Sequence, residues 1–138
     1  MTSKKKIKII IVDDQSQFRE SMKSFLEKEL EYQVIGIAKD GTEFLEMNNI
    51  SHADVILMDI EMPEFNGLET SKLALWKYNH LKIIAITMYK DNAYLKSLIE
   101  SGIRGFVHKT NIFNEIQQAI ELVCDNKQYF PLDLLLDQ

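Results

Sequence analysis

Five residues that can carry charge or donate a hydrogen bond follow the ends of short apolar runs in this sequence: Asp13, Asp14, Asp59, Thr87 and Lys109. Any one of them alone is typical of a turn or a helix cap. In a parallel sheet, however, the carboxyl ends of the strands meet at one edge, and ligands bind there. Three carboxylates gathered at that edge repel one another unless a cation compensates them. The set therefore predicts an acidic, cation-binding pocket.

The types of donor atom favour magnesium as that cation. Every expected ligand is an oxygen, and the three histidines and single cysteine of the chain do not have the spacing of metal ligands. Magnesium takes one or two carboxylates and completes its coordination with water and phosphate oxygens, so a phosphoryl group is the expected second ligand, with Mn²⁺ as the alternative ion. An aspartate carboxylate can attack phosphorus while a metal and a lysine neutralise the transferring oxygens.

Hydrophobic periodicity indicates the elements that position these side chains. Short apolar runs typical of buried strands cover residues 7–12, 32–38, 55–58, 82–86 and 105–108. Between and after them, apolar residues recur with helical spacing over residues 18–30, 42–45, 68–76, 91–102 and 112–123. The alternation predicts an α/β fold, a doubly wound parallel sheet with helices on both faces.

Capping residues mark the expected ends of two of these helices. Thr42, after the turn signal Asp40-Gly41, is expected to cap the second helix, and Asp91 the fourth. Gly102 is placed to end the fourth helix, because glycine adopts the left-handed conformation common there.

Four segments together resemble the signature set of bacterial response-regulator receiver domains: Ile11 to Asp14, Leu57 to Gly67, Ile86-Thr87 and Gly105 to Lys109. The residues from Thr87 to Asp91 and Tyr94-Leu95, taken with Gly105 to Lys109, are similar to receivers of the NarL/LuxR class. The resemblance covers roughly residues 7–125. It implies a flavodoxin-like fold, with five parallel strands in the order 2-1-3-4-5 and five helices.

The resemblance also implies a role for each acidic residue. Asp59 is expected to accept a phosphoryl group from a phosphohistidine of a sensor histidine kinase. Asp14 and Asp59 are expected to bind Mg²⁺ directly, Asp13 mainly through bound water, and Glu61 through its backbone carbonyl. On this interpretation the chain is not an enzyme beyond self-phosphorylation and autodephosphorylation.

The remaining site residues are expected to sense or protect the phosphoryl group. The resemblance implies that Thr87 and Lys109 bond phosphoryl oxygens, and that Phe106 is the switch aromatic, working by packing alone because it lacks a hydroxyl. Glu61 and Tyr89 lie two residues after Asp59 and Thr87, near the path of an attacking water. We hypothesise that Tyr89 slows hydrolysis; the alternative is an exposed tyrosine with no kinetic role.

The bond after Lys109 leaves one question of geometry open. Many relatives place a proline there, with a cis bond, whereas Thr110 follows here. A cis Lys109-Thr110 bond would cost roughly 3 kcal/mol, so it is expected only if the surrounding site enforces it.

Length and charge limit the other functions of the chain. Its 138 residues allow one compact domain, and the net charge of −5 argues against direct nucleic-acid binding by this chain. No apolar run is long enough for a membrane span, so no membrane partner is expected. The single cysteine, Cys124, excludes an internal disulfide and suits a reducing compartment, so the expected location is cytoplasmic.

Residues 1–126 are expected to form the receiver domain. Residues 127–138, which begin like the linker of NarL/LuxR-class regulators, are a C-terminal tail or the start of a linker to an output domain absent from this chain. The expected function is that of a phospho-accepting receiver of two-component signalling that switches its output surface, controlling transcription. The expected partners are a sensor histidine kinase, an output domain or downstream protein, and a second copy on phosphorylation.

Several other functions are alternatives. A stand-alone receiver would act by protein–protein interaction. An aspartate-nucleophile phosphatase would place a second aspartate where Glu61 stands and would need a cap for which the chain has no length. An FMN carrier would need a Ser/Thr/Gly-rich loop in place of Asp13-Asp14-Gln15, and the complete acidic set argues against an inert pseudo-receiver.

Overall fold

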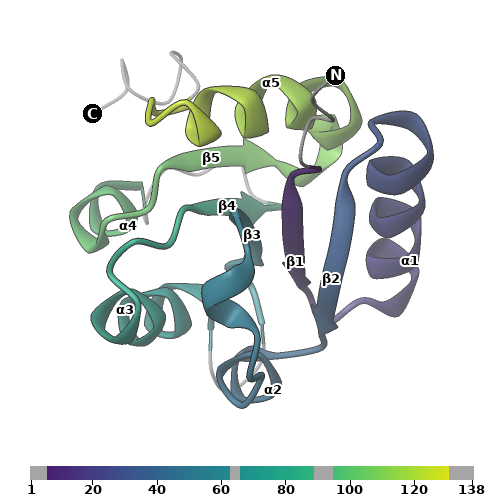
Figure 1. The fold of residues 1–138 in the computed structure, drawn as a ribbon. Coiled ribbons are helices and arrows are strands. Elements are labelled where there is room, and N and C mark those ends of the chain that lie inside the picture. Colours follow the sequence, from purple (N-terminus) through teal and green to yellow (C-terminus); the bar gives the residue numbers. More distant parts are fainter. Residues whose placement is uncertain (1–5, 63–65, 89–94, 131–138) are drawn as a thin grey trace, which may run out of the picture.

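The five apolar runs of the sequence form one parallel sheet in the computed structural model, which describes residues 6–62, 66–88 and 95–130. The strands are β1 (Lys8–Val12), β2 (Gln33–Ala38), β3 (Val55–Asp59), β4 (Ile83–Thr87) and β5 (Gly105–His108). They lie in the order β2-β1-β3-β4-β5, and every neighbouring pair is parallel (Figure 1). The predicted fold class and strand order are confirmed.

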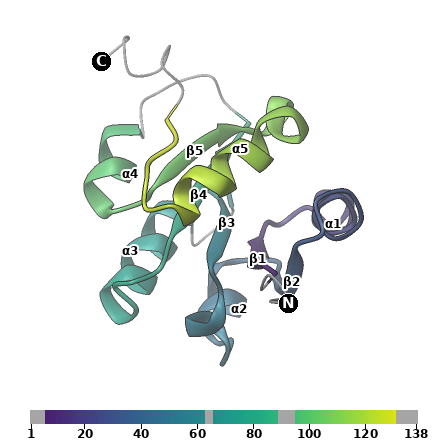
Figure 2. The ribbon, with the colours of Figure 1, turned by 45° about the horizontal axis from the view of Figure 1, so that its top comes forward.

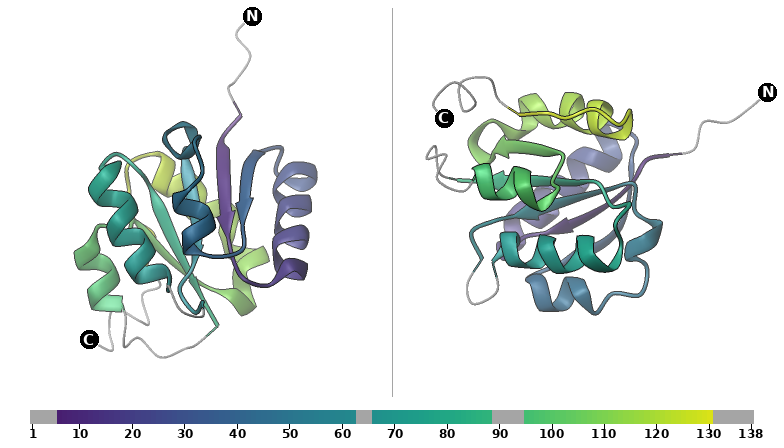
Figure 3. Two further views of the ribbon diagram at one scale, coloured as in Figure 1. Left: turned by 90° about the horizontal axis from the view of Figure 1, so that it is seen from below. Right: turned by 90° about the vertical axis from the view of Figure 1, so that its left-hand side faces the viewer.

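In the described part of the chain, five α-helices cover the two faces of this sheet: α1 (Ser16–Ser24), α2 (Gly41–Leu45), α3 (Gly67–Lys77), α4 (Leu95–Ser101) and α5 (Ile112–Cys124). A π-helical turn, Phe25–Glu29, continues α1, and 3₁₀ turns cover Ile50–His52 and Lys109–Asn111. Helices α2, α3 and α4 lie on one face, and α1 and α5 lie on the other (Figures 2 and 3).

Alternate residues along the strands point into two apolar cores, one under each layer of helices. Ile10 and Met58 pack with Phe44 of α2 and Ala74 of α3, whereas Ile11 and its neighbours pack with α1 and α5. Every residue of β3 and of β4 is buried, as expected for strands covered on both faces. The burial of β3 and β4 carries their last residues, an aspartate and a threonine, into the interior at the carboxyl edge.

The first turn of α2 differs from the prediction. Thr42 does not cap this helix: Asp40 is its N-cap and Gly41 its first residue, so the cap lies two residues earlier than predicted. The Oδ1 atom of Asp40 accepts a hydrogen bond of 2.8 Å from the amide of Glu43, whose own carboxylate accepts from the amide of Lys39 at 3.0 Å. This reciprocal pair satisfies two amides and stabilises the earlier start.

The end of α4 tests another prediction of a helix boundary. Gly102 follows α4 with a φ of 101°, so the predicted end of this helix is confirmed. The predicted cap of α4, Asp91, lies outside the described residues.

On the outer side of α3, Trp76 and Leu73 have exposed fractions of 85% and 49%, so this helix presents apolar side chains to solvent.

The chain after α5 returns to the edge of the sheet. Tyr129 pairs with β5: its carbonyl accepts from the amide of Phe106, and its amide donates to the carbonyl of Arg104, both at 2.9 Å. The hydroxyl of Tyr129 donates to Glu115 on α5 at 2.5 Å. The segment therefore covers the backbone groups at the start of β5 that an edge strand would otherwise expose.

Within the described ranges, no helix combines the length and the apolar character that crossing a membrane requires.

Candidate functional site

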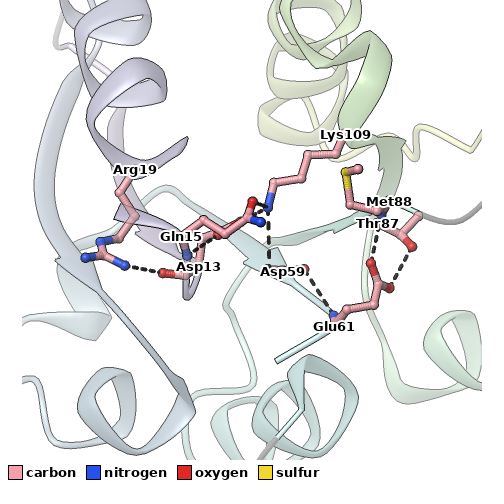
Figure 4. A network of polar contacts seen from close by, with 8 residues as sticks. All are labelled: Asp13, Gln15, Arg19, Asp59, Glu61, Thr87, Met88 and Lys109. Atoms are coloured by element: carbon pink, nitrogen blue, oxygen red, sulfur yellow. Dashed lines mark hydrogen bonds and ion pairs between the residues drawn. The ribbon is translucent and has the colours of Figure 1, made fainter. Parts of the chain in front are cut away.

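The structure brings the predicted acidic residues together at the carboxyl edge of the sheet (Figure 4). Asp13 directly follows β1, and Asp59 is the last residue of β3; both are buried, with exposed fractions of 1% and 2%. Asp14 is exposed. One carboxylate oxygen from each of the three aspartates lies within 4.8 Å of the other two. The site thus has a buried acidic floor and one carboxylate at the surface.

Lys109, directly after β5, supplies the positive charge of the site. Its Nζ atom lies 2.6 Å from Oδ2 of Asp13 and 3.8 Å from Oδ2 of Asp59. The same ammonium donates to Oε1 of Gln15 at 2.9 Å and lies 4.3 Å from the centre of the Phe18 ring. These four contacts hold a buried lysine across the pocket, nearer to Asp13 than to Asp59.

The electrostatic surroundings of Asp59 favour its neutral form. Burial raises the pKa of Asp59 to about 8, and the negative charge of Asp13 acts in the same direction. Lys109 and the hydrogen bond from the amide of Glu61, 3.0 Å from Oδ1, oppose this rise without cancelling it. A carboxylate in this position gains from any cation that enters the pocket.

The oxygen donors of the three aspartates fit such a cation. Mg²⁺ prefers carboxylate oxygens and keeps several waters, which suits a set of two buried carboxylates and one exposed carboxylate. The raised pKa of Asp59 supports this fit, because it reflects burial and the nearby negative charge of Asp13, which Lys109 does not offset. The backbone carbonyl of Glu61 as a further ligand stays a prediction.

Thr87, the last residue of β4, faces the site from the other side. Its hydroxyl donates to Oε2 of Glu61 at 2.6 Å, and the amide of Met88 donates to Oε1 of the same carboxylate at 2.8 Å. Thr87 is buried, with an exposed fraction of 2%. One side chain from the loop after β3 therefore holds the end of β4 (Figure 4).

Gly67, the first residue of α3, lies against the backbone of Asp59. A Cβ atom at Gly67 would lie 2.2 Å from the backbone oxygen of Asp59 and 2.7 Å from Cα of Ile60. The amide of Gly67 donates to the carbonyl of Ile60 at 3.2 Å. A side chain at this position would push α3 away from the strand that carries Asp59.

The other predicted residues fall in different surroundings. The ring of Phe106 is 1% exposed and packs in the core under α2, α3 and α4, so it occupies an inward position. The Lys109-Thr110 bond is trans, which answers the question that the sequence left open. Tyr89 lies outside the described residues, so its effect on phosphoryl lifetime stays a prediction.

Several contacts around Asp13 and Lys109 could not be predicted from the sequence. The side chain of Gln15 contacts Lys109, and Nη1 of Arg19 donates to the carbonyl of Asp13 at 2.7 Å. The ring of Phe18, the first residue of the apolar spacing over residues 18–30, also contacts the Lys109 ammonium. The position of Gln15, directly after the two aspartates, is the one signal that could have pointed to it.

Comparison with known proteins gives a family match over most of the chain. Residues 9–121 match the family described as Response regulator receiver domain. Transcriptional regulatory protein DegU of Brevibacillus brevis is 32% identical over 124 residues, which are 90% of this chain and 52% of DegU. Transcriptional regulatory protein LnrK of Bacillus subtilis (strain 168) is 35% identical over 128 residues, which are 93% of this chain and 58% of LnrK. The chain thus spans a little over half the length of these curated relatives.

Solved structures of similar proteins share the fold. A LuxR-family two-component response regulator from Aurantimonas sp. SI85-9A1 superposes with a TM-score of 0.87 at 25% identity, covering 96% of this chain and 94% of the other. The signal receiver domain of the response regulator NarL from Mycobacterium tuberculosis gives a TM-score of 0.80 at 26% identity, covering 90% and 100%.

Proposed function

Because this chain belongs to the response regulator receiver domain family, we propose that it accepts a phosphoryl group on Asp59 and changes its output surface in response. The observation that carries the proposal is the burial of Asp59 next to Asp13 and within ion-pair distance of Lys109. A carboxylate there can reach an incoming phosphoryl group, and the ammonium 3.8 Å away can neutralise one of its oxygens.

The proposed step transfers the phosphoryl group from a phosphohistidine of a sensor histidine kinase. An oxygen of the Asp59 carboxylate attacks phosphorus, the new P–O bond forms, and the P–N bond breaks. The histidine nitrogen leaves with the electron pair of that bond, and the product on this chain is an aspartyl phosphate. Hydrolysis by water later returns the free carboxylate. Receiver domains of transcriptional regulators are not classical enzymes, so self-phosphorylation and autodephosphorylation are the only reactions in the proposal.

In this proposal the three aspartates of the site hold Mg²⁺, with Mn²⁺ as the alternative ion. Asp14 and Asp59 would bind it directly, Asp13 mainly through water, and Glu61 through its backbone carbonyl. When bound, the ion would supply positive charge beside the transferring oxygens. Lys109 and Thr87 would each bond a phosphoryl oxygen, because the ammonium and the hydroxyl both belong to residues at this edge of the sheet.

The response would spread from Thr87 to the surface through Phe106. The buried ring of Phe106 packs in the same core as Leu95 and Leu98 of α4. A change at the end of β4 can therefore alter the packing of that helix, and we propose Phe106 as the switch residue. Tyr89 is proposed to shield the phosphoryl group from water.

The output of the whole protein is also part of the proposal. DegU and LnrK are named as transcriptional regulatory proteins and are longer than this chain, so we propose control of transcription through an output domain or a downstream protein. Residues 1–126 would form the receiver, residues 127–138 a tail or linker, and a homodimer would form on phosphorylation. A cytoplasmic location and a lack of direct nucleic-acid contact complete the proposal.

A depression of about 550 Å³ beside the site supports an approach by a protein partner. It is lined by side chains of α1, α5 and the loop before α1: Gln15, Ser16, Gln17, Phe18, Ser21 and Phe113. Gln15 and Phe18 also contact Lys109. A kinase domain seated there would therefore lie next to the ammonium of the site.

Chemical phosphorylation tests the central step. Incubation with acetyl phosphate and Mg²⁺ should give one acid-stable, base-labile modification by intact mass, mapped to Asp59 and absent from Asp59→Asn. Asp54→Asn is the matched control, because Asp54 stands just before β3 at the opposite edge of the sheet, where it accepts from the amide of Lys8. Labelling that survives Asp59→Asn, or wild-type protein that stays unlabelled, would overturn the proposal.

The same incubation also tests the alternative of an aspartate-nucleophile phosphatase. A phosphatase would release phosphate from acetyl phosphate over many turnovers, whereas the proposed receiver should release no more than its own slow dephosphorylation allows.

A further inference from the structure

The carboxylate of Glu61 binds two hydrogen-bond donors at the end of β4. Its two oxygens accept separately from the hydroxyl of Thr87, at 2.6 Å, and from the amide of Met88, at 2.8 Å. Glu61 and Thr87 are 26 residues apart in the chain, so this contact joins the loops after two neighbouring strands. The geometry is that of an anion bound by two adjacent donors.

The backbone of Glu61 contacts Asp59, the proposed phosphoryl acceptor. Its amide donates to Oδ1 of Asp59 at 3.0 Å, so one residue contacts Asp59 through its main chain and Thr87 through its side chain. A phosphoryl group on Asp59 would add a second anion within reach of Thr87. Two anions compete for the same hydroxyl proton, and they also repel each other.

We propose that the Glu61 carboxylate is an internal competitor of the phosphoryl group for the donors of Thr87 and Met88. It holds both donors in the unphosphorylated protein and must leave them when the phosphoryl group binds Thr87. The inference rests on the proposed function of Asp59 and Thr87 and extends it by assigning the side chain of Glu61 to the resting state. Glu61 acts through Thr87 and is therefore a positioning residue.

The competitor sets how strongly the site holds a phosphoryl group. Hydrogen bonds to a charged group are stronger than those between neutral groups, so breaking this pair opposes the switch. Removing the Glu61 side chain should therefore tighten binding of a phosphoryl analogue by about tenfold or more. Glu61→Gln, which keeps the shape and loses the charge, should show a smaller gain.

Titration with beryllium fluoride in saturating Mg²⁺ tests this prediction on the full chain. The apparent Kd of wild type, Glu61→Ala and Glu61→Gln is measured from the shift of backbone amide signals, with Glu20→Ala, an exposed glutamate on α1, as the matched control. We expect Glu61→Ala to bind about tenfold tighter and Glu20→Ala to match wild type. Equal or weaker binding by Glu61→Ala overturns the inference.

Two further measurements separate competition for Thr87 from other effects. In a Thr87→Ala background, Glu61→Ala should change the Kd by much less than in wild type; an undiminished gain overturns the inference. The amide signal of Met88 should move in Glu61→Ala without any ligand, and an unmoved signal contradicts the contact.

Controls on the metal and on the proposed function complete the design. Mg²⁺ titration without fluoride should give similar affinities for wild type and Glu61→Ala, and a parallel gain in Mg²⁺ affinity would assign the effect to the metal and overturn the inference. Wild-type protein that binds no beryllium fluoride at all would instead refute the proposed function of Asp59, and with it the inference.

Discussion

Lys109 forms its shorter ion pair with Asp13, at 2.6 Å, and not with the proposed acceptor Asp59, at 3.8 Å. The lysine therefore compensates the carboxylate beside the acceptor more fully than the acceptor itself. Asp59 keeps a pKa of about 8 as a result, since burial and the charge of Asp13 outweigh the more distant ammonium. A phosphoryl group on Asp59 would offer this ammonium a second, doubly charged partner.

Removal of the lysine charge should destabilise the protein. In Lys109→Met the buried carboxylate of Asp13 loses its cation, and breaking a buried ion pair costs about 3 kcal/mol or more. We expect the free energy of unfolding, measured by urea denaturation at pH 7 without metal, to fall by about that amount. Added Mg²⁺ should restore part of the loss, because it supplies charge to the same pocket. Lys82→Met, at the opposite edge, serves as the control, and an equal loss there would contradict the assignment.

The raised pKa of Asp59 predicts how stability changes with pH. The unfolded chain releases the Asp59 proton near pH 4, whereas the folded protein holds it to about pH 8. The folded state therefore binds more protons between these values, and its stability should decline from about pH 4 to about pH 8 and then level off.

Asp59→Asn isolates this contribution, because the amide does not titrate. Without metal, the stability of the variant relative to wild type should rise as the pH increases from 5 to 8, as measured by denaturation at each pH. A difference that is constant with pH would show that Asp59 is already ionised in the folded protein at pH 5.

Gly67 should be the least replaceable glycine for the site. Gly67→Ala would place a methyl group 2.2 Å from the backbone oxygen of Asp59, so we expect a loss of about 3 kcal/mol and weaker labelling by acetyl phosphate. Gly102→Ala is the comparison: its φ of 101° strains an alanine, but the nearest atom is the side chain of Leu75 at 3.4 Å. That variant should lose about 1 kcal/mol and keep its labelling. Equal labelling by both variants would argue against the role of close approach at Gly67.

Tyr129 should anchor the segment after α5. Burial and the hydrogen bond to Glu115 raise the pKa of Tyr129 to about 12, so its ring should ionise well above the usual range in an NMR titration. Tyr129→Phe removes the hydrogen bond and should lower the free energy of unfolding by about 1 kcal/mol. Ionisation of Tyr129 near pH 10 would mean that the contact with Glu115 does not persist in solution.

The strands, the layers and the acidic edge could be predicted from the sequence because each depends on a local pattern. Continuous apolar runs mark strands that are buried on both faces, and the acid or hydroxyl that ends each run marks the edge of the sheet. The strand order came with the resemblance to receiver domains, since periodicity does not determine which strands are neighbours.

Contacts between side chains from different loops could not be predicted. The pairing of Glu61 with Thr87 depends on how closely two loops approach, and the preference of Lys109 for Asp13 depends on a difference of about 1 Å between two nearby carboxylates. The cap of α2 was wrongly predicted because Asp40 and Thr42 both suit an N-cap, and the help that Asp40 receives from Glu43 decides between them.

Trp76 is the single tryptophan of the chain, and its exposed fraction of 85% gives the protein an unusual optical property. Its indole is nearly as hydrated in the folded protein as in an unfolded chain, so its emission wavelength should change little on denaturation. A protein that covers the outer side of α3 would move the indole into a less polar environment and shift the emission to shorter wavelength. Intrinsic fluorescence of this chain should therefore report occupancy of α3 and remain almost silent on folding.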